Sequence, residues 1–400
     1  MLTLVKYIWY TTLWTQGKLV LNAGEGIDFM KIKVGTVFSG IGAIEQALKR
    51  MGIDHDIMFA CDNGNIEIDI DADEELNKIR QLPTTKEKRD YANNLYKEKS
   101  RKNNFVEKSY LANYSIDENS YFYDIKLLDG KSFENKIDLY VGGSPCQSFS
   151  AIGNKAGLDD ARGTLFYDYV RVLSEIKPKV FIYENVFGLY RHDKGRTWKI
   201  IQEIFDSLGY HYKFEVLDSR DYGIPQGRRR IFVVGFKDKD KADQFQFPPK
   251  IELRSTMQDM LLDNISYGSL LSKNGVLNLS SNGGQSIEEK YYLSEKLLKY
   301  CLSAGTKNFY HTDAKIDLPI ARALLATMGN HHRSSVNNYV TTNGRVRSLT
   351  IEEAHRLMGF PDDYKIVVSK AQAYRQAGNS IVVDVLIAIM KEINKTMGWT

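Results

Sequence analysis

The 400-residue sequence is poor in cysteine and has no long apolar segment. Its three cysteines, Cys61, Cys146 and Cys301, lack the spacing of metal ligands, which favours free thiols in a reducing compartment over a disulfide framework. No apolar run is long enough to cross a bilayer, and residues 1–30 lack the basic, apolar and small-residue parts of a secretion signal. We therefore expect a cytoplasmic protein with no bound metal and no membrane partner.

The chain also lacks an excess of either charge, because 54 lysine and arginine residues nearly balance 50 aspartate and glutamate residues. The formal net charge of +4 excludes a polycationic chain, so any contact with nucleic acid must come from a local basic surface. Hydrophobic residues make up 43% and charged residues 26% of the chain, as in ordinary globular proteins. Since 400 residues exceed the usual size of one domain, we expect two lobes.

Apolar runs with strand composition alternate with helical periods through much of the chain. The predicted strands cover residues 31–39, 56–61, 121–125, 137–142, 179–183, 211–217 and 230–236. The predicted helices cover residues 43–51, 165–176, 198–208, 351–358 and 381–393. Several of these strands are nearly all apolar, which indicates burial on both faces. The pattern predicts an α/β fold with a doubly wound, mostly parallel sheet.

Two segments interrupt this alternation. Residues 65–120 are polar and of mixed charge with a helix-like centre, which predicts a surface insertion between the second and third strands. Residues 237–345 are rich in glycine, serine and asparagine and indicate a smaller, less regular lobe. The expected organisation is an N-terminal extension (1–30), a main domain (31–236) that residues 371–397 complete, and a small domain (237–370).

The first predicted strand runs into a glycine-containing turn, Phe38-Ser39-Gly40-Ile41-Gly42. Its two glycines allow the backbone to approach a ligand and present amides at a helix N-terminus. Glu45 stands where a dinucleotide-binding turn would carry its third glycine, which argues against a bound pyrophosphate.

Three residues at the ends of the next two predicted strands suit a nucleoside. Asp62 could accept hydrogen bonds from a ribose, and Asp124 and Ile125 could meet the edge and face of an adenine. Taken singly, each residue of these strand ends or of the glycine turn is better explained by an ordinary α/β protein with solvated acids at its strand ends.

The segment Gly142–Ser150 (GGSPCQSFS) places Cys146 just beyond a buried strand, where ligands bind in such folds. A thiol in that position can gain thiolate character and act as a nucleophile. A lone cysteine is more often a buried structural residue. Here, however, Glu184 ends the adjacent strand, and the run Arg228-Arg229-Arg230 directly precedes the last strand of the main domain. A thiol, a carboxyl and a guanidinium are therefore predicted around one pocket.

At these positions the sequence resembles the cytosine-C5 DNA methyltransferases in their compact bacterial form. Six blocks match in the family order: FSGIG at 38–42, GGSPCQSFS at 142–150, ENV at 184–186, QGRRR at 226–230, RSLTIEEAHRLMGFP at 347–361 and YRQAGNSI at 374–381. Six ordered blocks are not expected by chance, and PCQ, ENV and GNS are the most specific of them. The resemblance spans nearly all of residues 31–393 except the insertion and much of the irregular lobe.

The resemblance implies a Rossmann-like methyltransferase sheet and S-adenosylmethionine as methyl donor, with S-adenosylhomocysteine as product. The cofactor-binding residues that it implies are Phe38, Ser39, Gly40, Ile41, Gly42, Asp62, Asp124, Ile125, Asn379 and Ser380. Among these, Phe38 would stack on the adenine, Asp62 would bind the ribose, and Asn379 with Ser380 would close the pocket.

The resemblance also assigns the catalytic and DNA-contacting residues. Cys146 is the expected nucleophile, Glu184 binds the cytosine ring nitrogen and amino group, and Arg230 binds the ring carbonyl. Arg228 is also counted among the catalytic residues, and Arg228 and Ser150 are expected to hold the DNA backbone phosphate near the flipped nucleotide. The stretch that carries Gly153, Lys155, Gly157 and Arg162 is a candidate closing loop.

These residue types suit methylation of a poor nucleophile. Thiolate addition at carbon 6 of cytosine makes carbon 5 electron-rich, and Glu184 and Arg230 stabilise the charge that develops on the ring. The base must first be flipped out of the duplex at a cost of a few kcal/mol. No side chain in the matched blocks is identified as the base that removes the carbon 5 proton.

The irregular lobe corresponds to the family's target-recognition region. Its polar residues His331, His332, Arg333, Asn337 and Asn338 could contact DNA, or could be ordinary loop residues. The threonine-leucine pair common in this region is absent, with Ala323-Leu324 or Leu324-Leu325 as the nearest match. The expected partners are double-stranded DNA and a functionally linked restriction endonuclease, and the expected oligomeric state is a monomer.

Three alternatives remain at this stage. A methyltransferase for exocyclic amines would carry a Pro-Pro-aromatic element where this chain has Ser144-Pro145-Cys146. A tRNA cytosine-C5 methyltransferase shares the scaffold, but the extra lobe and the absence of a Cys-Phe-Thr element favour DNA. A catalytically inactive DNA-binding homologue is disfavoured by Cys146, Glu184 and Arg230.

Overall fold

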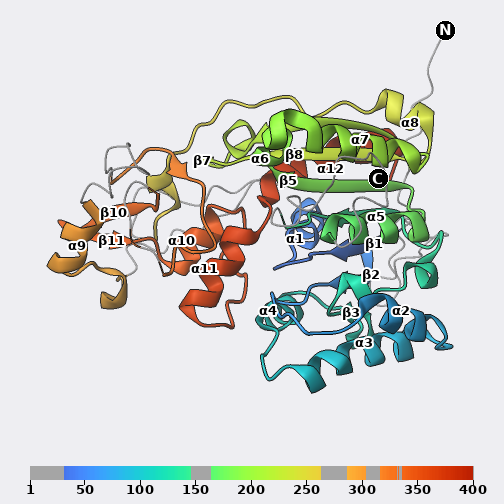
Figure 1. Cartoon of the computed structure of the whole chain (residues 1–400). Helices are drawn as coiled ribbons and strands as arrows, with labels where there is room; N and C mark the ends of the chain where they lie inside the picture. The colour runs from blue at the N-terminus through green and yellow to red at the C-terminus, as the bar shows by residue number, and fades with distance from the viewer. Residues whose placement is uncertain are drawn as a thin grey trace, which may run out of the picture. The chain divides into compact units, whose positions relative to one another are not determined.

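Apolar strands lie side by side in one sheet at the centre of the computed structural model (Figure 1). The structure describes residues 31–145, 164–262, 286–302, 316–330, 332 and 336–399, and within them seven strands form this sheet in the order β3-β2-β1-β4-β5-β8-β6. Their bounds are β1 (Ile32–Val37), β2 (His55–Cys61), β3 (Tyr121–Phe122), β4 (Leu139–Gly142), β5 (Val180–Val186), β6 (His211–Asp218) and β8 (Arg229–Phe236). Only β8 runs antiparallel to its neighbours β5 and β6. The predicted mostly parallel α/β sheet is confirmed.

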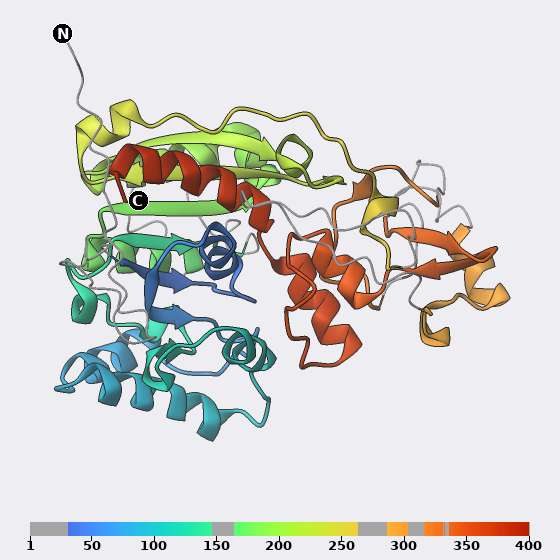
Figure 2. The ribbon, with the colours of Figure 1, turned by 180° about the vertical axis from the view of Figure 1, so that it is seen from behind.

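Side chains alternate between the two faces of the sheet, as the period of a strand requires. Tyr140 and Phe181 pack with α5 (Leu165–Ile176) and α7 (Arg196–Ser207), which lie on the near side in Figure 1. Their sequence neighbours Val141 and Ile182 pack with α1 and α12 on the other face, seen in Figure 2. The helices on this second face are α1 (Ala43–Met51), α8 (Lys239–Gln244) and α12 (Val383–Met397). Since α12 ends the described chain, the C-terminal segment completes the cover of the sheet.

The third strand is shorter than predicted. Residues 121–125 were expected to be extended, but β3 contains only Tyr121 and Phe122, and a 3-10 helix follows over Ile125–Leu127. The cause is local, because Asp124 Oδ1 accepts a hydrogen bond from the Lys126 amide at 2.9 Å and so caps that helix. A short acidic side chain competes in this way with the hydrogen bonds of a strand. The prediction of strand at residues 123–125 was wrong.

The polar insertion forms three helices, α2 (Ala72–Arg80), α3 (Thr85–Lys99) and α4 (Phe105–Asn113). Each begins at a residue whose side chain accepts a hydrogen bond from a first-turn amide, namely Asp71, Thr84 and Asn104. The insertion is also tied to the main domain through Tyr110, whose hydroxyl donates to Glu45 Oε1 at 2.6 Å. The predicted helical centre is confirmed, and the insertion packs against α1.

Shorter elements make up much of the region between β8 and α12. They are α9 (Glu295–Leu302), β9 (Ala321–Arg322), β10 (Tyr339–Thr342), β11 (Arg345–Ser348), α10 (Ile351–Arg356) and α11 (Lys370–Asn379). Strands β10 and β11 pair antiparallel, and β9 pairs with β7 (Gln226–Gly227). The ion pair between Arg347 and Glu353 is fully buried, with Nη1 and Oε2 2.8 Å apart.

The domain boundaries at 236/237 and 370/371 stay predictions.

The polar residues suggested as DNA contacts in this region differ in their burial, and two of them lie outside the described residues. Asn337 and Asn338 are both buried, and Asn338 exchanges hydrogen bonds with the backbone of Arg322. His332 is half-buried with Nδ1 at 3.3 Å from the Tyr339 hydroxyl. His331 and Arg333 lie outside the described residues, as does the expected extension 1–30. Where the chain is described, no helix has the length and apolar character that a membrane span requires.

Glu45 provides a test of how the insertion packs on α1. Its side chain is buried, and burial raises its pKa from 4.5 to about 7. A raised pKa in the folded state means that the protonated carboxyl stabilises the fold, fully below about pH 4.5 and no longer once the pH rises through about 7. We predict that Glu45→Gln, which cannot ionise, has a free energy of unfolding about 3 kcal/mol above that of the unmodified protein near pH 8.

Urea denaturation of both proteins across this pH range would check the prediction. The difference between them should shrink as the pH falls and vanish below about pH 4.5, where Glu45 is protonated in both the folded and the unfolded state. A difference that does not change with pH would contradict the assigned pKa.

Candidate active site

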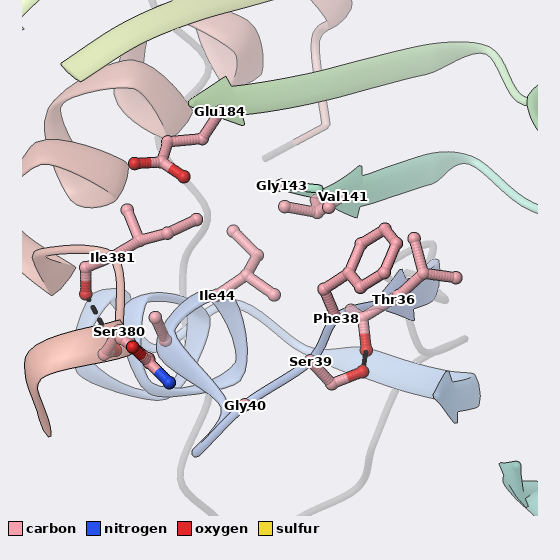
Figure 3. Close-up of a pocket in the computed structure, with 14 residues that line it drawn as sticks. Thr36, Phe38, Ser39, Gly40, Ile44, Val141, Gly143, Glu184, Ser380 and Ile381 are labelled. Carbon is pink, nitrogen blue, oxygen red and sulfur yellow. Dashed lines mark hydrogen bonds between the residues drawn. The ribbon is translucent and has the colours of Figure 1, made fainter. Parts of the chain in front are cut away.

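A pocket opens at the carboxyl ends of β1, β4 and β5 (Figure 3). It encloses about 460 Å³ of empty space, part of which is open to solvent. The residues that line it are Thr36, Val37, Phe38, Ser39, Gly40, Ala43, Ile44, Val141, Gly142, Gly143, Glu184, Asn379, Ser380 and Ile381. Four regions that are far apart in the sequence therefore meet here: the glycine turn after β1, the end of β4, the end of β5, and the segment from the end of α11 to Ile381. Six residues predicted from the sequence line this one pocket.

The glycine turn is held in a conformation that few side chains allow. Gly40 and Gly42 have φ of +55° and +77°, and Phe38 itself has φ of +50°. Ser39 fixes the turn against β2, because its amide donates to the Cys61 carbonyl at 3.2 Å and its hydroxyl accepts from the Cys61 amide at 2.9 Å. Gly42 caps α1 without any side-chain hydrogen bond. The first amides of α1 thus lie beside the pocket with no side-chain acceptor from the cap residue.

Asp62 holds this turn through hydrogen bonds from backbone amides. Its Oδ2 accepts from the Gly40 amide and its Oδ1 from the Gly64 amide, at 2.9 and 2.8 Å. Burial raises the pKa of Asp62, while these two backbone hydrogen bonds lower it. Its carboxyl has a structural partner at each oxygen and does not line the pocket. The ribose contact expected of Asp62 stays a prediction.

The expected adenine contacts also lie outside the pocket lining. Asp124 is buried and its Oδ2 accepts from the Tyr96 hydroxyl at 2.5 Å. Ile125 is buried and its carbonyl accepts from Arg171 Nη2 at 2.6 Å. Ile41 and Gly42 are buried beneath the turn rather than on its pocket side. The binding roles of these four residues stay predictions.

Glu184 is the acid of the pocket, at the end of β5. Its Oε1 lies 3.0 Å from Arg230 Nε, and the two side chains are 13% and 19% exposed. Burial raises the pKa of Glu184, and the charges of Arg230 and Arg228 only partly oppose that rise. The antiparallel register of β5 and β8 puts Glu184 opposite Phe232, two residues along from Arg230, so Glu184 and Arg230 are diagonal neighbours on one face. A carboxyl that holds its proton more firmly than usual therefore faces the cleft beside a guanidinium.

Small residues and hydrogen bonds hold the end of β4 against Glu184. A Cβ atom on Gly143 would lie 2.7 Å from the Glu184 carbonyl oxygen and Oε2, so only glycine permits this approach. Asn185 Nδ2 donates to the Ser144 carbonyl at 2.8 Å, and the Ser144 and Tyr183 hydroxyls are 2.8 Å apart. Sequence reasoning did not assign these roles, although Asn185 stands inside the matched ENV block.

The predicted nucleophile follows directly after this ordered backbone. Cys146, the phosphate-contacting Ser150 and the candidate loop residues Gly153, Lys155, Gly157 and Arg162 all lie outside the described residues. Their roles stay predictions.

Arg228 has partners that differ from the phosphate contact expected of it. Its side chain is buried, with Nη1 donating to the Leu324 carbonyl at 2.9 Å and Nη2 donating to the Gly378 and Ser380 carbonyls at 2.9 and 2.8 Å. Burial lowers the pKa of Arg228 to about 9, which still leaves it charged at neutral pH. In this position the guanidinium joins β8 to the segment that closes the pocket.

Exposed cations lie close to this buried group. Arg229 is exposed and its guanidinium lies over the ring of Phe187, 4.7 Å from the centroid. Arg191 lies over the same ring at 4.7 Å. Phe187 begins α6 (Phe187–Arg191), directly after Val186. No sequence motif indicated this pair, which places two positive charges over one ring at the start of α6.

We predict that Arg228→Lys lowers the free energy of unfolding by about 2–3 kcal/mol. Lysine lacks the planar guanidinium that donates to all three carbonyls at once. Chemical denaturation would measure this loss. As a matched control, Arg229→Lys at the exposed neighbouring position should change stability by less than about 0.5 kcal/mol. If Arg228 instead bound a phosphate, Arg228→Lys, which keeps the positive charge, would keep both its stability and the salt dependence of DNA affinity.

Residues 90–395 match the family described as C-5 cytosine-specific DNA methylase. Among curated proteins, the chain is 34% identical to the type II methyltransferase M.HhaI of Haemophilus parahaemolyticus, over 66% of this chain and 77% of that protein. It is also 34% identical to the type II methyltransferase M.SsoII of Shigella sonnei, over 73% of this chain and 72% of that protein.

Solved structures share the fold at lower identity. The Dnmt2 methyltransferase of Schizosaccharomyces pombe aligns with a TM-score of 0.59 at 18% identity, covering 92% of this chain and 99% of that one. The Entamoeba histolytica methyltransferase EhMeth aligns with a TM-score of 0.56 at 17% identity, covering 92% and 99%. At such identity the likeness concerns the fold alone. On the family match and the relatives at 34% identity, the chain belongs to the C-5 cytosine-specific DNA methylase family and is a DNA cytosine methyltransferase.

Proposed function

We propose that this enzyme transfers a methyl group from S-adenosylmethionine to carbon 5 of a cytosine that is flipped out of a specific duplex DNA sequence. The observation that carries this proposal is the pocket itself, which joins the glycine turn, Glu184 and the Asn379–Ser380 segment around one space (Figure 3). The type II names of the relatives support a role in protecting host DNA beside a cognate restriction endonuclease. The proposed state in solution is a monomer, and residues 237–370 are the proposed target-recognition domain.

The residues of the pocket fit S-adenosylmethionine. An aromatic ring for the adenine is available at Phe38, and the first amides of α1 can donate hydrogen bonds to the carboxylate of the methionine moiety. A Cβ on Gly40 would meet only the Phe38 carbonyl oxygen, at 3.9 Å, among the atoms of the described residues, so the backbone at Gly40 leaves room for a ligand. Ser380 and Asn379 close the opposite side. When bound, the cofactor supplies an electrophilic methyl group on a sulfonium, and S-adenosylhomocysteine remains as product.

The proposed chemistry begins with the Cys146 thiolate, which forms a bond to carbon 6 of the cytosine. The electron pair of the 5,6 double bond then becomes available at carbon 5, which forms a bond to the methyl group. Loss of the proton from carbon 5 restores the double bond and releases the thiolate. The base that takes this proton is unassigned.

Glu184 and Arg230 are proposed to make the addition feasible. A carboxyl whose pKa is raised by burial holds its proton to higher pH than an ordinary glutamate and can donate it to the ring nitrogen as negative charge builds on the ring. Arg230 holds Glu184 through the 3.0 Å contact of its Nε and keeps a positive charge beside the site. Ser150 is proposed to contact the backbone phosphate next to the flipped nucleotide.

We predict that Glu184→Gln slows methyl transfer by about 10²–10³-fold, since the amide cannot give a proton to the ring. Single-turnover transfer of labelled methyl to duplex DNA would measure the rate. The rate of the unmodified enzyme should fall as the pH rises through the raised pKa of Glu184, and the variant should lack this descending limb. Affinity for S-adenosylhomocysteine should stay within about twofold, and equal transfer rates would refute the role of Glu184.

We predict that Cys146→Ala lowers transfer by more than about 10⁴-fold, because no other group in the matched blocks can add to carbon 6. Bisulfite sequencing of DNA from expressing cells would report activity, base and target sequence together. With duplexes that contain 5-fluorocytosine and with the methyl donor present, the unmodified enzyme should form a covalent adduct on a denaturing gel.

Cys301→Ala is the matched control, since Cys301 is buried beside Tyr339 and should leave the adduct intact. An adduct with Cys146→Ala, or none with the unmodified enzyme, would reject the proposed nucleophile.

A further inference from the structure

The insertion contacts both walls of the pocket through its last helix and the residue after it. We call residues 105–114, which comprise α4 and Tyr114, the α4 bracket. The proposed function leaves this segment without a role, and no block of the family resemblance covers it.

On one side, the bracket holds the glycine turn. The Tyr114 hydroxyl donates to the Gly42 carbonyl at 2.7 Å and to the Ile41 carbonyl at 3.1 Å. Burial raises the pKa of Tyr114, so the hydroxyl stays protonated and remains a donor. The ring also packs on the turn, because a Cβ on Gly42 would lie 2.2 Å from Tyr114 Cε2. Tyr114 therefore supports the backbone that carries Gly40 on its pocket side.

Two further contacts extend this support. One turn into α1, the Tyr110 hydroxyl bonds Glu45 Oε1 at 2.6 Å. Just before α4, Asn104 Nδ2 donates to the Asp62 carbonyl at 2.7 Å. Asp62 in turn accepts from the Gly40 amide at 2.9 Å. The bracket and its cap residue thus hold the turn through three side chains, those of Tyr114, Tyr110 and Asn104.

On the other side, the bracket holds α11. Ser109 Oγ donates to Gln376 Oε1 at 2.9 Å, and Gln376 Nε2 donates to the Phe105 carbonyl at 2.8 Å. Gln376 lies in the last turn of α11, and its own carbonyl accepts from the Ser380 amide at 3.1 Å. The helix therefore connects the bracket to the segment Asn379–Ser380, which lines the pocket, and Ser380 lies across it from Phe38 and Ser39 (Figure 3).

We propose that the α4 bracket positions the glycine turn and the Asn379–Ser380 segment relative to each other, and so sets the affinity of the pocket for S-adenosylmethionine. This inference rests on the proposed function, which places that ligand between the two walls. The walls come from opposite ends of the described chain, and a ligand that spans them binds tightly only if their separation is preset. Tyr114 and Gln376 are positioning residues, because they act through the turn and through α11 rather than by touching the ligand.

The test compares three variants in the full-length enzyme. Tyr114→Phe removes the hydroxyl bonded to the turn, and Gln376→Leu removes both hydrogen bonds to α4. Tyr91→Phe is the matched control, since it deletes a hydroxyl that bonds Glu75 at 2.8 Å within the insertion and away from the pocket. Isothermal titration with S-adenosylhomocysteine measures affinity without turnover, and thermal unfolding confirms that each variant is folded.

We predict that Tyr114→Phe and Gln376→Leu each weaken S-adenosylhomocysteine binding by about 5–30-fold, as expected for the loss of one or two hydrogen bonds that preset a site. The KM for the methyl donor should rise in parallel, while kcat changes less than about threefold. Gln376→Glu, which keeps the acceptor for Ser109 but loses the donor to Phe105, should give an intermediate loss. Tyr91→Phe should bind like the unmodified enzyme.

Unchanged affinity in both Tyr114→Phe and Gln376→Leu would overturn the inference while leaving the proposed function intact. An equal loss in Tyr91→Phe would also overturn it, because the effect would then be a general weakening of the insertion. Failure of the unmodified enzyme to bind S-adenosylhomocysteine would reject the proposed cofactor itself, and the inference with it.

Discussion

The active site depends on one buried cation, the guanidinium of Arg228. A charged group removed from water must find compensating partners, and here three backbone carbonyls supply them. Those carbonyls belong to Leu324, Gly378 and Ser380, so the same group fixes the small lobe and the segment that closes the pocket. Because Arg228 precedes β8, this attachment is made at the strand that also carries Arg230. The Gly378–Ser380 wall of the pocket and the Glu184 carboxyl are therefore held by Arg228, just before β8, and by Arg230, within β8.

Acidic side chains around the pocket fall into two groups. Asp62 and Asp124 have hydrogen-bond partners within the protein at both carboxyl oxygens, and they shape the backbone of the turn and of the segment after β3. Glu184 is instead paired through one oxygen and lines the cleft. The difference matters chemically, since a carboxyl whose hydrogen bonds are already used supports structure, whereas one that is buried and partly open can exchange a proton.

Much of the fold could be predicted from the sequence, because strands buried on both faces leave short apolar runs that alternate with helical periods. The order FSGIG, PCQ, ENV and GNS placed Phe38, Ser39, Gly40, Glu184, Asn379 and Ser380 together, and the pocket contains all six. The end of β3 was predicted too late in the chain, because the strand pattern does not show that the Asp124 side chain caps a 3-10 helix there. The buried position of Arg228 was missed because an arginine run looks the same whether its members face solvent or carbonyls.

The sequence by itself determined the family, the alternation that builds the sheet, and the residue types that the chemistry needs, since these follow from short-range pattern and from side-chain identity. Only the tertiary structure decided which of three consecutive arginines is buried, exposed or paired with Glu184. It also decided that the polar insertion reaches both walls of the pocket. Such roles depend on contacts between residues as far apart in the sequence as Ser109 and Gln376. A local sequence pattern does not indicate which distant groups a side chain will contact.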